Sequence, residues 1–119
     1  MVSPAGDGRP SLEPLSLVLC NAPPDDAVRI ARALVERRLV ACVNVVPGVT
    51  SVYRWKGELQ VDAESTLLLK TRAALVADLT AAILELHPYE VPEVVALPLD
   101  VTTGNAAYHA WVLDETRPA

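Results

Sequence analysis

The feature that most constrains the fold is an alternation of apolar and polar residues between Val40 and Lys70. The mostly apolar odd-numbered positions are Ala41, Val43, Val45, Val49, Ser51, Tyr53, Leu59, Val61, Ala63, Leu67 and Leu69. Polar residues such as Asn44 and Glu58 fill many of the even-numbered positions. Successive side chains of a β-strand point to opposite faces, so a period of two is typical of strands. With Lys56-Gly57 between the two halves, the pattern predicts a hairpin of two long strands.

Two loop lengths are compatible with the tip of this hairpin. A two-residue turn at Lys56-Gly57 would pair Tyr53 with Gln60 and place apolar residues opposite polar ones. A three-residue loop over residues 55–57 pairs Tyr53 with Leu59 and puts the glycine where a positive φ is needed. We therefore predict the three-residue loop.

Shorter elements flank the hairpin on both sides. The predicted elements are a strand over residues 15–20, a helix ending near Arg38, a second helix capped by Thr71 with an apolar stripe of Leu75, Leu79, Ile83 and Leu86, an edge strand over residues 91–99, and a short helix opened by Asn105. Pro88 requires the second helix to end at Leu86 or His87. Pro47-Gly48 predicts a β-bulge in the first hairpin arm, because proline cannot donate to a sheet ladder.

The order of these elements predicts an α+β fold, the ferredoxin-like βαββαβ sandwich with both main helices on one face of the sheet. It also carries a long hairpin between the second and third strands and a short C-terminal helix. We expect a flexible N-terminal tail over residues 1–14, a single domain over residues 15–114 and a C-terminal tail over residues 115–119.

The hairpin is too long for a compact monomer. Arms of about 13–16 residues reach roughly 45–50 Å, whereas a compact domain of this size is about 34 Å across. The tip must therefore extend beyond the domain and expose its apolar face, which proteins normally cover with another chain. We predict an oligomer whose interface contains Tyr53, Trp55, Leu59 and Val61.

Charge and composition exclude several classes of function. The net charge of −5 and the pI of about 4.9 argue against a nucleic-acid partner, since phosphate binding needs clustered Lys and Arg. We expect no membrane span, because no apolar run approaches the necessary length. The first 14 residues lack the apolar region of a signal peptide, and Cys20 and Cys42 suit a reducing compartment, so we expect a cytoplasmic protein.

An enzyme is disfavoured by the motifs that are missing. The loop after the first predicted strand, residues 20–26, contains two prolines and two carboxylates but no glycine or arginine, so it would repel an anion. The sequence shows no nucleophile–histidine–carboxylate order and no glycine-rich phosphate loop.

Several spaced motifs resemble the CutA divalent-cation tolerance family. They are Ala-Cys-Val-Asn from residue 41, Pro-Gly at 47, Tyr-Arg-Trp-Lys-Gly from 53, Leu-Lys-Thr from 69, His-Pro-Tyr-Glu from 87, and Gly104 with Tyr108 and Trp111. The similarity covers about residues 15–113. It implies a ferredoxin-like fold, a tight homotrimer locked by the long hairpins, and a link to copper and other divalent metals. Ile83 stands where some members have a further cysteine, which argues against a three-thiolate copper site.

The candidate metal ligands are His87, Cys42 and Glu90. A neutral imidazole binds many transition metals and a thiolate favours Cu(I), so the candidate cofactor is copper or another divalent cation. Each residue also has a simpler interpretation. His87 at a helix end is equally compatible with a cap on the last carbonyls, and a single strand cysteine is more often a packing residue.

A ligand cleft is the second candidate site. Glu64 and Lys70 share a strand face and, with Tyr89, are expected to line a cleft near a subunit boundary. Glu64 and Lys70 are as readily explained by a solvated face. A trimeric small-molecule sensor similar to PII-type regulators therefore remains an alternative to metal binding.

Overall fold

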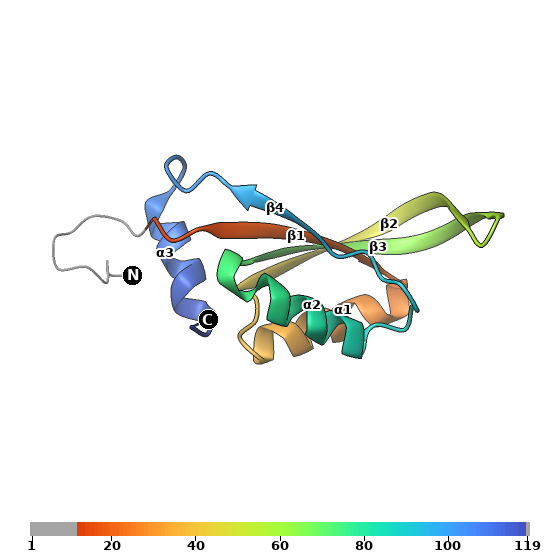
Figure 1. Ribbon diagram of the computed structural model, residues 1–119, viewed down its shortest axis with the longest axis horizontal. Coiled ribbons are helices and arrows are strands. Elements are labelled where there is room, and N and C mark those ends of the chain that lie inside the picture. The colour runs from red at the N-terminus through yellow and green to blue at the C-terminus, as the bar shows by residue number, and fades with distance from the viewer. Residues whose placement is uncertain (1–11, 119) are drawn as a thin grey trace, which may run out of the picture.

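The computed structural model describes residues 12–118. The elements are β1 (Leu15–Ala22), α1 (Pro24–Glu36), β2 (Cys42–Trp55), β3 (Glu58–Arg72), a 3₁₀ turn η1 (Ala73–Leu75), α2 (Val76–Leu86), β4 (Val95–Leu99) and α3 (Ala106–Glu115). Figure 1 labels the strands and the α-helices. The strands form one antiparallel sheet in the order β2-β3-β1-β4. The predicted βαββαβ plan is confirmed.

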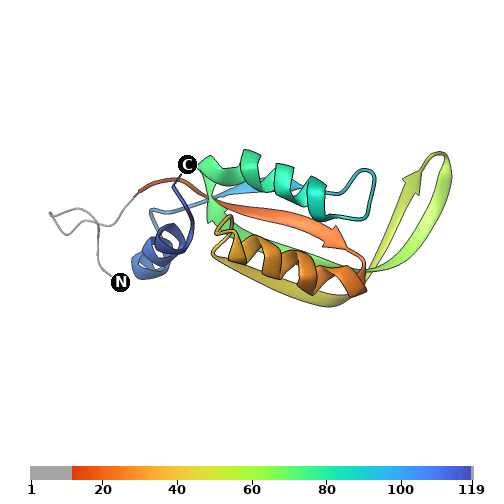
Figure 2. The same ribbon diagram turned by 90° about the horizontal axis from the view of Figure 1, so that it is seen from below.

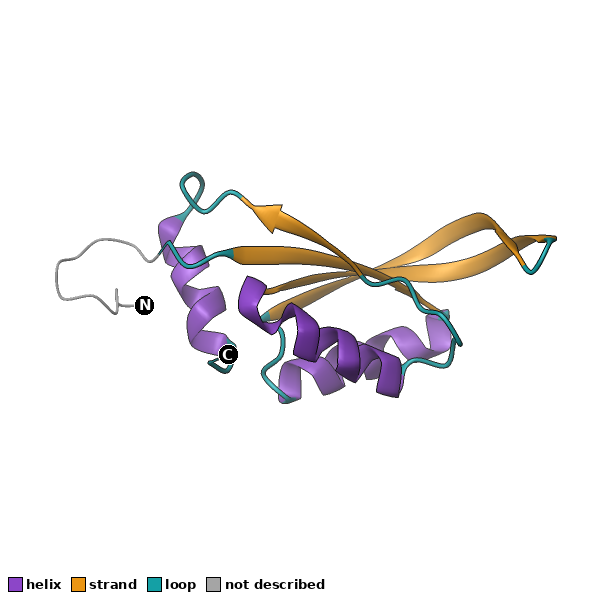
Figure 3. Ribbon diagram, in the orientation of Figure 1, coloured by secondary structure: helices purple, strands orange, loops and turns teal. Residues whose placement is uncertain are grey.

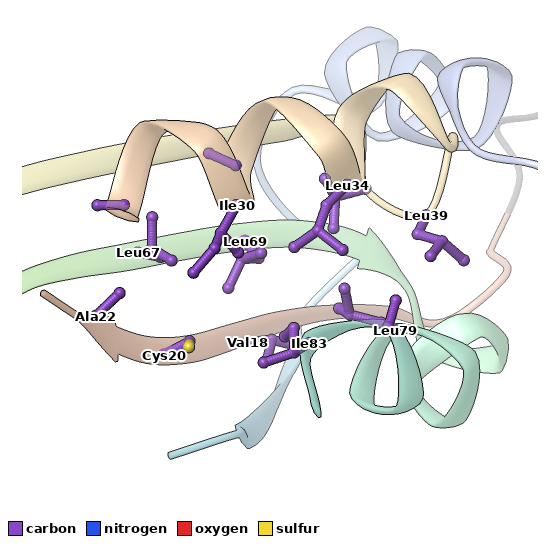
Figure 4. Packing of buried hydrophobic residues seen from close by; sticks show 14 of the residues in the cluster. Val18, Cys20, Ala22, Ile30, Leu34, Leu39, Leu67, Leu69, Leu79 and Ile83 are labelled. Carbon is purple, nitrogen blue, oxygen red and sulfur yellow. The ribbon is translucent and has the colours of Figure 1, made fainter. Parts of the chain in front are cut away.

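The helices α1 and α2 lie side by side on one face of the sheet (Figures 2 and 3). Between them and the strands lies the main core, drawn in Figure 4. Its fully buried members include Val18 and Cys20 of β1, Leu67 and Leu69 of β3, Ile30 and Leu34 of α1, and Leu79 and Ile83 of α2. Alternate residues of each central strand thus face the helices, which leaves the residues between them on the opposite face. We call this opposite side the open face of the sheet.

The helix ends agree with the predictions in part. Helix α2 ends at Leu86, because the next residue, His87, precedes Pro88. The side chain of Asn105 caps α3 by accepting a hydrogen bond of 3.0 Å from Ala107 N. Thr71 was expected to cap α2, and that prediction is wrong. This residue is buried inside β3, its hydroxyl donates to Leu39 O at 2.6 Å, and the 3₁₀ turn intervenes before α2.

The predicted three-residue hairpin loop is also wrong. The structure pairs Trp55 with Glu58 and Tyr53 with Gln60 around a two-residue turn, in which Lys56 has φ 51° and Gly57 has φ 82°. Positive φ at both central residues gives a type I′ turn, whose twist matches that of the flanking strands. Both faces of the tip are exposed in one chain, so apolar burial does not favour the other register.

The bulge predicted at Pro47-Gly48 is confirmed, because the register of β2 against β3 shifts between Val46 and Val49. The single extra residue of the bulge reverses the parity of β2 beyond this point. As a consequence Val52 lies opposite Val61, on the face continuous with the helix side, whereas Tyr53 shares the open face. The expectation that Tyr53 joins Leu59 and Val61 on one face is therefore corrected.

The hairpin extends well beyond the helix layer (Figure 1). The molecule measures 56 × 25 × 21 Å, and its radius of gyration of 15.8 Å exceeds the value of about 13–14 Å expected for a compact domain of this length. At the tip Val52, Leu59 and Val61 are 64%, 66% and 63% exposed. We call these three residues the tip patch.

Arg72 joins the two ends of the described chain. Its guanidinium contacts Glu13 Oε1 at 2.9 Å, Leu113 O at 2.7 Å and Thr116 Oγ1 at 3.0 Å. Glu115 belongs to α3 and Thr116 is buried, so the expected tail from residue 115 begins as part of the domain. The expected N-terminal tail lies largely outside the described residues. Within residues 12–118, no helix combines the length and the apolar character needed to cross a membrane.

Candidate functional site

A cleft of about 640 Å³ opens where the connection from α2 to β4 passes the end of β1 and the base of the hairpin overhang. Its lining residues are Asn21, Ser51, Val52, Tyr53, Trp55, Glu64, Pro88, Tyr89, Glu90, Val91 and Glu93. This volume is within the range of small-molecule sites, which is about 300–1,000 Å³. Tyr89, Glu90 and Glu64 were predicted from the sequence to belong to a site, and the structure brings these three together.

The end of β1 creates room for this cleft. Strand β4 pairs with β1 only as far as Leu19, so the last residues of β1 have no neighbouring strand on that side. The connection after α2 takes its place. There the imidazole of His87 bonds to Asn21 O through Nε2 at 2.7 Å, and Tyr89 N donates to Nδ1 at 3.1 Å.

Both ring nitrogens of His87 are thus occupied. A carbonyl oxygen only accepts and a backbone amide only donates, so Nε2 carries the proton and Nδ1 supplies its lone pair to Tyr89. The side chain is buried, and its ring lies 4.7 Å from that of Tyr89. His87 therefore anchors the connection to β1. The capping alternative expected a bond to the last carbonyls of α2, whereas the imidazole bonds to a carbonyl of β1.

Glu64 is the most buried carboxylate of the cleft, with 5% of its surface exposed. Its Oε2 accepts a hydrogen bond of 2.9 Å from the hydroxyl of Tyr89. Burial and this carboxylate together raise the pKa of Tyr89 above its ordinary value. On the hairpin, the hydroxyl of Tyr53 donates to Asp62 in the same way, and that bond raises the pKa of Tyr53.

The lining of the cleft is acidic and aromatic. Its charged members are the carboxylates of Glu64, Glu90 and Glu93, and its aromatic members are Tyr53, Trp55 and Tyr89. None of its lining residues is Lys, Arg or His. The arrangement is therefore suited to a ligand that carries positive charge and apolar surface.

Cys42 and Lys70 do not reach this cleft. Lys70 Nζ lies 4.0 Å from Cys42 Sγ and bonds to Asn44. Cys42 pairs with Lys70, which pairs with Leu17 of β1, four positions before Asn21. Four residues of strand span about 13 Å. The single cleft predicted for Glu64, Lys70 and Tyr89 is therefore corrected to two separate groups.

The metal-ligand set predicted for His87, Cys42 and Glu90 is likewise not assembled. Among residues 12–118, no three side chains of His, Cys, Asp or Glu are grouped so that they could hold a metal ion. The structure gives a physical reason for each residue. His87 uses both nitrogens, Cys42 lies elsewhere on the sheet, and Glu90 is 3.5 Å from the ammonium of Lys56.

Some cleft residues carried no clear signal in the sequence. Asn21 was interpreted only as a turn residue, although it lies on the open face and supplies the carbonyl that holds His87. Ser51, Pro88 and Val91 are ordinary strand or loop residues in the sequence. Glu93 could be suspected from its position near His87. Their convergence depends on the path of residues 87–94, which a local pattern does not reveal.

The model of the CutA1 divalent ion tolerance protein family matches residues 16–115, which is most of the chain. This protein belongs to the CutA family. Similar relatives include the divalent-cation tolerance protein CutA of Thermus thermophilus, 48% identical over 101 residues that cover 84% of this chain and 96% of that protein. A CutA homologue of Xenopus laevis is also 48% identical, and human CutA is 43% identical.

Solved CutA structures share the fold. The structure of CutA1 from Oryza sativa superposes with a TM-score of 0.85 at 41% identity, covering 89% of this chain and 96% of that one. A protein from Nostoc described as PII-like CutA, in its apo form, superposes with a TM-score of 0.82 at 44% identity, covering 86% and 97%. The ferredoxin-like fold and membership of a non-enzymatic family follow.

The relatives differ in length and compartment. This chain spans 66% of the Xenopus protein and 64% of the human one. The CutA of Arabidopsis thaliana is named chloroplastic, and that of Archaeoglobus fulgidus is named periplasmic. The family therefore does not fix a compartment, and cytoplasmic localisation stays a prediction.

Proposed function

We propose that this CutA protein acts in divalent-cation tolerance as a homotrimer, and that it binds the cation weakly near a subunit boundary. The observation that carries the proposal is the uncovered apolar surface of the single chain. The tip patch lies on the same face of the sheet as the helices α1 and α2, but beyond the ends of these helices. There nothing in the described chain packs on the patch. Proteins normally cover such long exposed strands with another chain.

The open face of the sheet supports the same assembly. Val46 on the edge strand β2 is 41% exposed, and Val95 and Leu97 on the opposite edge strand β4 are 50% and 43% exposed. The partners of the last two in β1 are Leu19 and Leu17, which alternate with the core residues and so face away from the helices. An apolar sheet face of this kind is expected to pack against other subunits.

Within one chain, the donors that remain for a metal are few. Cys42 is a half-buried thiol on the open face, and Glu90 is an exposed carboxylate at the mouth of the cleft. A complete coordination shell would need ligands from more than one subunit, so we expect weak binding. Because the thiolate of Cys42 is a soft ligand, we expect the site to favour copper. Cys42 and Glu90 are the residues to test, with His87 as a buried structural control.

The cleft favours a second candidate function, the sensing of a small molecule. Its volume of about 640 Å³ suits an organic ligand better than a bare ion. The description of the Nostoc relative as PII-like is consistent with this interpretation. The two functions can be distinguished at Cys42, which lies apart from the cleft, whereas both involve Glu90.

One experiment tests the assembly and the metal binding together. Light scattering at low micromolar concentration should give the mass of three chains, and calorimetric titration with Cu(II), and with Cu(I) under reducing conditions, should show weak uptake. Cys42→Ala and Glu90→Gln should each lower that uptake while the trimer persists. A monomeric mass would refute the proposed assembly, and unchanged uptake in both variants would refute the proposed ligands.

A further inference from the structure

The ammonium group of Lys56 lies at the mouth of the cleft. Lys56 Nζ is 3.5 Å from Glu90 Oε2 and 5.6 Å from the centroid of the Trp55 ring. Both partners line the cleft, whereas Lys56 itself does not. A carboxylate together with an aromatic face is the combination that proteins use to hold an alkylammonium group. In the single chain the side chains of Lys56 and Glu90 are 69% and 71% exposed, so an external ammonium can replace this internal one.

A second carboxylate lies inside the cleft. Glu64 is almost fully buried, with 5% of its surface exposed. Within residues 12–118 this carboxylate accepts one hydrogen bond, from Tyr89 to Oε2, which leaves Oε1 for a donor in the cleft. Buried carboxylates need a charged or hydrogen-bonding partner, so this position favours a cationic donor.

The charged residues that line the cleft are all acidic. Burial raises the pKa of the nearby Cys20 thiol to about 12, and the charges of Glu93 and Glu64 add to that shift. The cleft has no basic lining residue to attract an anion. It also lacks the three converging ligands that a metal ion would need within the described chain. An organic cation fits the acidic surroundings, the lack of basic lining residues and, among the described residues, the lack of a metal-ligand set.

We propose that the cleft binds a small organic cation with an ammonium group at each end, one on Glu64 and one between Glu90 and Trp55. The proposal names the ligand class for the small-molecule function suggested above and rests on that function. The aliphatic part of such a ligand would lie against Tyr53 and Tyr89. Lys56 would then act as a tethered competitor for the outer position.

Calorimetric titration of the full chain with 1,4-diaminobutane tests the proposal. Its neutral isostere 1,4-butanediol and its charge-reversed analogue succinate serve as ligand controls. We expect saturable binding of the diamine alone, weakened by added salt because the attraction is between charges. Fluorescence provides a second measurement, since Trp111→Phe leaves Trp55 as the only tryptophan, and its emission should change with the same midpoint.

Two substitutions separate a built site from general charge attraction. Glu64→Gln should weaken diamine binding about ten-fold, the loss expected for one hydrogen bond to a charged group. Lys56→Met should strengthen it about three-fold, because it removes the competing ammonium. The matched controls are Glu36→Gln and Arg32→Met, which make the same changes of charge at exposed positions of α1 outside the cleft. Neither should alter the affinity.

Equal binding of butanediol or succinate, equal effects of the control variants, or weaker binding by Lys56→Met would overturn the proposal. So would a cleft that takes only a divalent metal ion when Cu(II) is titrated in place of the diamine. Light scattering on the same samples separates this outcome from failure of the assembly. A trimer without diamine binding refutes the ligand class alone, whereas a monomer refutes the proposed trimer.

Discussion

Two buried side chains show how the tertiary environment redirects ordinary chemistry. The thiol of Cys20 is enclosed by the core, and the imidazole of His87 is held between Asn21 O and Tyr89 N. Each would be a reactive group or a metal ligand in another setting. Here burial keeps the thiol protonated, and the two hydrogen bonds use both imidazole nitrogens.

The Cys20 thiol predicts a loss of stability at high pH. Its pKa is raised from 9.0 to about 12 by burial first, and then by Glu93 and Glu64. The unfolded chain therefore loses the proton first, so this contribution is complete below pH 9 and declines as the pH rises towards 12. Urea unfolding at fixed protein concentration should show a slope of up to about 1.4 kcal/mol per pH unit from this group. In Cys20→Ala the slope should be shallower, and an unchanged slope would contradict the assignment.

His87→Ala should lower the free energy of unfolding by about 1–3 kcal/mol, because Asn21 O and Tyr89 N would lose their buried partner. Copper uptake at pH 7.5 should be unchanged relative to the wild type. His109→Ala, at the other histidine, provides the matched control for both measurements. Loss of copper binding with unchanged stability would restore His87 as a metal ligand.

At the scale of elements, the hairpin shows which features a pattern of residues can predict. The strands, the bulge at Pro47-Gly48 and the positive φ of Gly57 were predicted correctly. The register was predicted wrongly, because it was chosen to pair apolar residues that a single chain leaves exposed on the tip. There the type I′ geometry of Lys56-Gly57 is the stronger constraint.

The turn can be tested by a pair of substitutions. Gly57→Val should destabilise the hairpin by about 1–3 kcal/mol, since a β-branched residue is strained at a φ of 82°. Lys56→Asn should be neutral or stabilising, because Asn-Gly is the preferred type I′ pair. Denaturant unfolding at one protein concentration measures both. A stabilising Gly57→Val would be incompatible with this turn.

For the whole molecule, the long axis of 56 Å and the bare tip patch are most simply explained by assembly. Val61→Asp should dissociate the proposed trimer at low micromolar concentration, because it would bury a charge without a partner. Val28→Asp makes the same change on α1, where valine is 56% exposed, and should leave the mass unchanged. Light scattering distinguishes the two variants. If both remain trimeric, the tip patch is not an interface.

The sequence by itself determined the order of elements, the α2 stripe that ends at Leu86, the cap at Asn105 and the glycine turn. These features depend on interactions within a few residues, so local periodicity and backbone preference suffice. Only the tertiary structure decided that Asn21, Glu64 and Tyr89 converge in one cleft while Cys42 lies with Lys70. Those contacts join residues that are distant in the chain, and they depend on where β4 stops pairing with β1 and on a bulge that reverses the faces of β2.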